Sequence, residues 1–222
     1  MNQSRKTVFF LVLAAVALAG MMILAGCSDD DDPVVVPDPD PPIGPESLGE
    51  LMVQFHSAYE AMDLENYLAL LDPEFLMILG DETIIDFPDV GTTLDFTKEE
   101  RIHQRLFSGE NHADPDGDFV PGTNAISFLV FQALAEWLPS DDEDQFPGTV
   151  WAPFELDLLF DRGQQFSTLK VEGMVKIYAR THEAEVDGTT IAYYLMAGMV
   201  DLTGYRKGVE SEAWGSVKAL YR

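Results

Sequence analysis

The spacing of hydrophobic residues predicts two helices at the start of the folded region. Between residues 47 and 62 apolar side chains recur at steps of three and four, which is the period of one helix face. Ser47 and Glu50 have the spacing of a capping box at its start. A second short helix should begin at Asp63 and end at Asp72-Pro73, because the residue before a proline is pushed out of the helical region.

Further along the chain the hydrophobic period changes from near four to two. Thr97 and Glu100 repeat the capping-box spacing and predict a third helix that stops near Gly109. A short apolar strand is predicted before this helix, at Phe75–Leu79. After the helix come five alternating runs that are typical of strands, separated by turn residues such as Asp187-Gly188: Ala125–Leu138, Phe154–Asp161, Leu169–His182, Ile191–Thr203 and Ala213–Tyr221. Helices followed by a long antiparallel meander predict an α+β fold.

The alternation also predicts which face of each strand is wet. In Phe154–Asp161 the aromatic and leucine side chains share one face, while Glu155 and Asp157 point the other way. The next run places Lys170 and Lys176 on the face away from its valines. We therefore expect a solvated outer face with pairs of opposite charge, and helices over the apolar face. Asp201 has the parity of the apolar positions in its run: Ile191, Tyr193, Leu195, Ala197 and Met199.

An export signal is predicted ahead of the folded region. Arg5 and Lys6 precede an apolar run from residue 8 to residue 26. The run ends in Leu24-Ala25-Gly26-Cys27, which resembles the lipobox of bacterial lipoproteins. The resemblance implies cleavage between Gly26 and Cys27 and acylation of the Cys27 thiol with long chains such as palmitate. It places the protein in the cell envelope, and Ser28 at the next position favours the outer over the inner membrane. The alternative is an ordinary transmembrane anchor.

A polar spacer separates this segment from the folded region. Residues 28–45 read SDDDDPVVVPDPDPPIGP, and a stretch so rich in proline and aspartate favours an extended, solvated chain. The predicted organisation is a lipoprotein signal peptide at 1–26, an acylated cysteine with an acidic tether at 27–45, and one domain at 46–222.

Composition excludes several classes of partner and site. The whole chain has 13 Lys and Arg against 39 Asp and Glu, a formal charge of −26, which would repel the phosphates of nucleic acid. With one cysteine there is no internal disulfide and no multi-cysteine metal site. No motif for a cofactor, a nucleotide or a serine nucleophile is present, so we expect no cofactor. Asp114, Asp116 and Asp118 alternate as in a calcium loop but lack its later glutamate, so no metal site is assigned.

The order of elements and the local sequence resemble the nuclear transport factor 2-like, or SnoaL-like, domains. Residues 55–75, FHSAYEAMDLENYLALLDPEF, are similar to the helix, Asp-Leu turn and second helix with which those domains begin. The segment Trp214–Tyr221 resembles their last strand. The resemblance implies the cystatin-like superfold, in which a curved antiparallel sheet forms a cone around N-terminal helices, with a ligand pocket at its wide end.

Several residues are candidates for that pocket. Phe55, Tyr59 and Tyr67 lie on the predicted helix faces that would line it, and Tyr59 with Asp201 or Asp95 is a weak candidate for catalysis. The preferred hypothesis is a lipid-anchored envelope protein whose domain binds a small apolar ligand or a protein partner without assured catalysis. The alternatives are an isomerase- or dehydratase-type enzyme that uses a pocket carboxylate, and a dimerisation or assembly module, in which the domain forms a homodimer.

Overall fold

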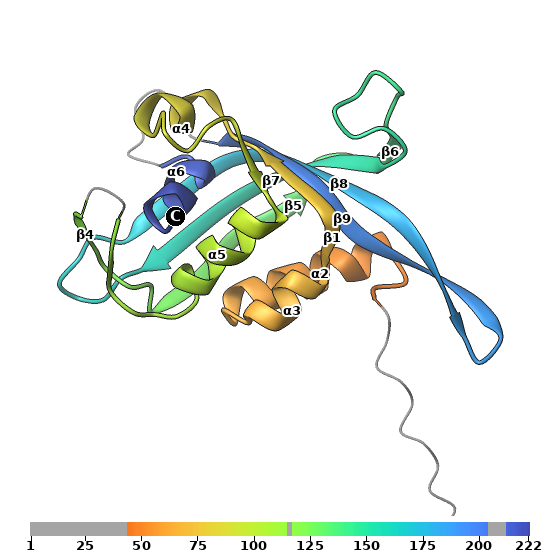
Figure 1. Ribbon diagram of the computed structural model, residues 1–222, viewed down its shortest axis with the longest axis horizontal. Coiled ribbons are helices and arrows are strands. Elements are labelled where there is room, and N and C mark those ends of the chain that lie inside the picture. The colour runs from red at the N-terminus through yellow and green to blue at the C-terminus, as the bar shows by residue number, and fades with distance from the viewer. Residues whose placement is uncertain (1–43, 115–116, 204–211) are drawn as a thin grey trace, which may run out of the picture. The chain divides into compact units, whose positions relative to one another are not determined.

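A long, curved sheet forms the framework of the domain (Figure 1). The computed structural model describes residues 44–114, 117–203 and 212–222. Within them the strand order is β2-β1-β9-β8-β7-β5, with β6 paired to β7, and only β1 and β9 run parallel. The strands are β1 Leu71–Ile78, β2 Thr93–Asp95, β5 Ala125–Ala133, β6 Leu138–Pro139, β7 Val150–Asp161, β8 Leu169–Val186 and β9 Thr189–Thr203; β3 His112–Ala113 and β4 Phe119–Val120 form a separate ribbon. The predicted α+β class with a curved antiparallel sheet is confirmed.

Helices cover one face of this sheet. They are α2 Leu48–Glu60, α3 Leu64–Ala69, α5 Phe96–Leu106 and α6 Trp214–Leu220, while α4 Asp81–Asp86 packs against α6. Figure 1 shows α2, α3 and α5 together on the concave side of the sheet. No helix among the described residues combines the length and the apolar character that a membrane crossing requires.

The predicted caps of α2 and α3 are present. The Ser47 hydroxyl accepts the N–H of Glu50 at 3.1 Å, and the Asp63 carboxylate accepts the N–H of Asn66 at 3.1 Å. The predicted start of α5 is wrong. Its N-cap is Asp95, which accepts the N–H of Lys98 at 2.9 Å, so Thr97 already lies inside the helix.

The two faces of β7 and β8 are as the alternation predicts. Leu156, Leu158 and Val175 are fully buried on the helix side. On the outer side the Lys170 ammonium lies 3.1 Å from an Asp157 oxygen and 3.0 Å from a Glu172 oxygen. A solvated outer face that carries pairs of opposite charge is therefore confirmed.

The predicted last strand is wrong, because residues Trp214–Leu220 form α6. Every residue from Ala213 to Ala219 is buried, Lys218 included, so the segment has no wet face that could display a period. The resemblance of this segment to the last strand of nuclear transport factor 2-like domains therefore does not hold.

The predicted face is wrong for several residues of β9, because this strand contains a bulge. Tyr178 pairs with Gly198 whereas its neighbour Ala179 pairs with Met196, so Ala197 is an extra residue in the ladder. The parity of β9 reverses there. Leu195 lies opposite the outward Arg180, whereas Asp201 lies opposite the inward Val175. Ile191, Tyr193 and Leu195 thus do not share the face of Asp201.

Candidate functional site

The interior that the cone prediction assigns to a pocket is filled with aromatic rings. Phe55, Tyr59 and Tyr67 are at most 1% exposed. The ring centroid of Phe55 lies 5.5 Å from that of Tyr59 and 6.1 Å from that of Tyr67. Trp214 packs against Phe55 and Tyr59. The structure thus places the three pocket candidates in the core, in contact with one another, and none of them lines a described hollow.

A buried ion pair lies within this core. The Lys218 ammonium of α6 contacts the Glu99 carboxylate of α5, and both side chains are fully buried. The Tyr67 hydroxyl donates a hydrogen bond to Glu99 Oε1 at 2.7 Å. The second oxygen, Glu99 Oε2, has no hydrogen-bond partner among the described residues. Burial raises the pKa of Glu99, but the Lys218 ammonium and the hydrogen bond from Tyr67 outweigh it and hold that pKa below its usual value.

His103 extends this cluster to Tyr59. His103 Nδ1 lies 3.0 Å from the carbonyl oxygen of Glu99, and Nε2 lies 3.3 Å from the Tyr59 hydroxyl. Because a carbonyl only accepts, we assign the ring proton to Nδ1, so that Nε2 accepts from Tyr59. The Tyr59 oxygen in turn accepts the indole N–H of Trp214 at 3.0 Å. Burial lowers the pKa of His103 to about 4, so the ring is neutral at pH 7.

Sequence reasoning missed Glu99, His103 and Lys218. A signal for the first two is present, because Glu99, Ile102, His103 and Leu106 fall at the three- and four-residue steps of one helix face, and all four are buried. Two polar residues therefore occupy core positions of α5. For Lys218 no such signal exists, since a helix buried on all sides has no period.

Asp201 is committed to a structural contact. It is 1% exposed, and burial raises its pKa. One carboxylate oxygen accepts the N–H of Thr203 at 2.9 Å, and the other accepts the N–H of Gly215 at 2.7 Å. The Thr203 hydroxyl oxygen accepts the N–H of Trp214 at 2.6 Å. Asp201 and Thr203 together satisfy the first amides of α6. Asp95, the other candidate carboxylate, is the exposed cap of α5.

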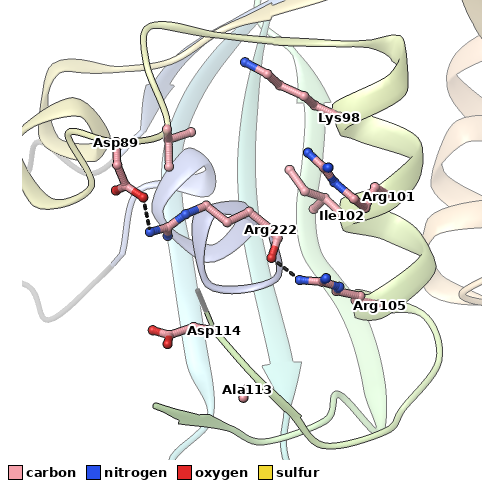
Figure 2. A pocket seen from close by; sticks show the side chains of 9 residues that line it. Asp89, Lys98, Arg101, Ile102, Arg105, Ala113, Asp114 and Arg222 are labelled. Carbon is pink, nitrogen blue, oxygen red and sulfur yellow. Dashed lines mark hydrogen bonds and ion pairs between the residues drawn. The ribbon is translucent and has the colours of Figure 1, made fainter. Parts of the chain in front are cut away.

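The described residues also form an open cleft in which basic side chains gather. The cleft holds about 390 Å³ and lies between one face of α5 and the segments around residues 89–90, 113–114 and 222. Figure 2 shows Lys98, Arg101 and Arg105 projecting from α5, with Arg222 nearby. Asp89 and Asp114 also line it.

The four cations differ in how far they are already engaged. An Arg222 nitrogen lies 2.7 Å from an Asp89 oxygen, and Arg105 donates to the backbone oxygen of Arg222 (Figure 2). The Lys98 ammonium donates to a backbone carbonyl at 3.1 Å. Arg101 is exposed and makes no hydrogen bond or ion pair with a described residue. Its guanidinium is therefore available to a ligand.

Two other hollows are less polar. A groove of about 260 Å³ lies between α2 and the sheet edge, lined by Met52, Val53, His56, Ser57, Phe131 and Phe154. A hollow of about 540 Å³ lies along α2 and α3 next to Pro45. The first is lined mainly by apolar side chains, and its volume is below the usual range for ligand pockets.

The remaining predicted site residues are those of the calcium loop and of the lipobox. Asp114 accepts the N–H of Asp118 at 2.8 Å, and Asp116 lies outside the described residues. Within residues 44–114, 117–203 and 212–222, no group of three or more His, Cys, Asp or Glu side chains is placed to hold a metal ion. Gly26 and Cys27 also lie outside the described residues.

No family model and no curated protein matches this sequence. Solved structures are similar at low identity. One is a proposed dehydratase from the nuclear transport factor 2-like family of Streptomyces avermitilis, at 12% identity and TM-score 0.35, covering 70% of this chain and 92% of that one. Another is a proposed aromatic ring hydroxylase of Novosphingobium aromaticivorans, at 10% identity and TM-score 0.43, covering 77% and 92%. A conserved protein of Planctomyces limnophilus has 6% identity and TM-score 0.42, covering 69% and 91%.

Proposed function

We propose that this chain is a lipid-anchored protein of the cell envelope whose domain binds a small ligand without transforming it. The anchor is supported by the sequence alone, through the lipobox that ends at Cys27 and the apolar run before it. Acyl chains on Cys27 would hold the protein on its membrane, since each buried methylene contributes about 0.8 kcal/mol. The acidic tether would keep the domain clear of the lipid surface, and the outer membrane remains the favoured location.

Binding is favoured over catalysis because the titratable groups of the core are buried, whereas the Arg101 side chain of the cleft is exposed. Glu99, His103 and Asp201 are at most 1% exposed and bond to neighbours inside the protein. A general acid or base must come within hydrogen-bond reach of its substrate, and none of the three meets solvent. The cleft beside α5 is open, and the exposed Arg101 in it makes no hydrogen bond or ion pair with a described residue. We therefore propose this cleft as the ligand site.

The experiment combines native mass spectrometry with a blocking label. The chain contains one cysteine, and its thiol would be acylated, so Ala113→Cys introduces a single free thiol in the cleft. The full chain, extracted in nonionic detergent, should retain a small molecule that is lost after a bulky maleimide reacts with the Ala113→Cys variant. The matched control is Ala133→Cys, at an exposed position of β5 that lines no described hollow. A ligand displaced equally from both variants, or from neither, would place the site elsewhere.

One observation favours a second candidate, an acid–base enzyme of the isomerase or dehydratase type. The unpaired oxygen Glu99 Oε2 lies in the same buried cluster as two tyrosines and a neutral histidine, and perturbed groups of this kind gather at active sites. Such an enzyme would have to open between α5 and α6. Product formed from a metabolite extract by the parent chain, and lost in a folded Glu99→Gln variant, would establish it.

The assembly alternative is less favoured. The outer sheet face carries ion pairs, and Phe146 covers part of it by packing its ring 4.4 Å from that of Tyr178. Gly198 permits this approach, because a Cβ there would lie 2.1 Å from the Phe146 ring. A charged, partly covered face is unlike the apolar centre of an obligate dimer.

A further inference from the structure

We propose that the α5 cleft binds a small polyanion, a molecule that carries two or more carboxylate or phosphate groups. The inference rests on the proposed function for the identity of the site, and it adds the chemical class of the ligand. It concerns a molecule that fits within about 390 Å³, which is the size of an ordinary small-molecule site.

The distribution of basic residues carries the first step. The described residues include nine Lys and Arg: Lys98, Arg101, Arg105, Arg162, Lys170, Lys176, Arg180, Lys218 and Arg222. Four of the nine line this one cleft, with two carboxylates, Asp89 and Asp114, beside them. The lining thus has a formal excess of positive charge within a chain of −26. A hollow of opposite sign to the rest of the molecule concentrates the field on ligands that enter it.

The arrangement along α5 carries the second step. Lys98, Arg101 and Arg105 follow one another at steps of three and four, so they lie on one face of the helix. Seven residues of helix span about 10 Å, so the cations form a row rather than a single point. A row favours a ligand with several anionic groups over a monoanion. Arginine, with its planar fork of donors, suits carboxylate and phosphate equally well.

The availability of these donors carries the third step. Arg101 has no hydrogen-bond or ion-pair partner among the described residues, and Arg105 and Lys98 each donate one hydrogen bond to a backbone oxygen. In a protein with three acidic residues for every basic one, an arginine without a carboxylate partner is notable. The net charge of the chain also repels anions elsewhere on its surface, so measurable binding of a polyanion would require a local site.

The test is calorimetric titration of the full chain in nonionic detergent and low salt with two probes, tricarballylate and pyrophosphate. At least one should bind, and binding should weaken as salt rises. Arg101→Gln should raise its Kd about tenfold or more, because a charge-assisted hydrogen bond is lost without breaking an internal pair. The matched control is Lys170→Gln, which removes the same charge from the outer face of β8 and should leave the Kd within about twofold.

The outcomes separate this inference from the proposed function. Selective loss in Arg101→Gln supports a polyanion site, and the preferred probe then tells carboxylate from phosphate. Equal weakening in both variants would overturn it, because the effect would then be one of net charge. Failure of both probes would also overturn it, while a neutral molecule displaced by the label on Ala113→Cys would leave the proposed function standing.

Discussion

At the scale of single residues, the core of this domain contains charges that most cores exclude. Moving a carboxylate and an ammonium out of water costs several kcal/mol each, which their attraction repays only with good geometry and further hydrogen bonds. Glu99 and Lys218 have such support on one side, from Tyr67 and from the Met77 sulfur that lies 3.3 Å from the Lys218 ammonium. Because the pair joins α5 to α6, it also fixes the position of α5, which borders the cleft.

His103 gives the domain a predictable response to acid. Its pKa is about 4 in the folded state and near 6.5 in the unfolded chain, so between these values the unfolded state binds more protons. Stability from this residue is fully present above pH 6.5 and declines as pH falls toward 4. We expect the free energy of unfolding in urea to lose about 2 kcal/mol between pH 7.5 and pH 5 on account of His103.

Two variants isolate this contribution from that of the surface carboxylates. His103→Gln cannot titrate, so its unfolding free energy should vary less over the same pH interval by that amount. Ile102→Val, one residue away in α5, should cost about 1 kcal/mol at every pH and keep the parent slope. An unchanged slope in His103→Gln would show that the ring does not enter the core as a neutral group.

At the scale of elements, the hydrophobic pattern predicts the helices and strands that have one face in solvent. It does not predict elements that are buried on all sides. The start of α2 at Ser47 and the buried face of β7 follow from periodicity and caps, because each element separates core from solvent. The hairpin turn at Asp187-Gly188 is also as predicted, with φ of 51° and 77° at its two residues. In contrast α6 is buried all round, and the bulge at Ala197 in β9 depends on pairing with β8. Neither leaves a mark in the local pattern.

The buried cap of α6 leads to a prediction about Asp201. Its two oxygens accept from Thr203 and from Gly215, whereas the amide of Asn has only one oxygen, so Asp201→Asn turns an NH₂ group toward a donor. We expect a loss of about 2 to 3 kcal/mol in urea unfolding. Asp63→Asn is the matched control at the cap of α3, where Asn caps as well as Asp. The Asn66 amide that donates to the second Asp63 oxygen is exposed and can turn to water, so the change should stay within about 0.5 kcal/mol. Equal small effects would mean that Asp201 does not hold α6.

At the scale of the whole molecule, charge is distributed in a way that no single segment shows. The sequence places Lys98, Arg101 and Arg105 within one helix, and this much could be read from spacing. The approach of Arg222 and of residues 89–90 to that helix depends on tertiary structure, because they come from other parts of the chain. The pocket inside the cone is a prediction from resemblance, and the structure shows that its predicted lining residues, Phe55, Tyr59 and Tyr67, pack against one another in the core, where Phe55 and Tyr59 also contact Trp214.

In the proposed function, attachment of the whole molecule to the membrane depends on one atom, the sulfur of Cys27. If the lipobox is read by the lipoprotein pathway, Cys27→Ser removes the only nucleophile that can receive an acyl chain, and labelling with radioactive palmitate in a bacterial host should fall to background. The variant should also keep its signal segment and migrate as the heavier, unprocessed chain. Ser28→Ala, at the next position, leaves the thiol in place and should be labelled and processed like the parent. Equal label on Cys27→Ser and the parent would rule out a lipid anchor at this residue, and it would leave the apolar run from residue 8 to residue 26 as a transmembrane anchor.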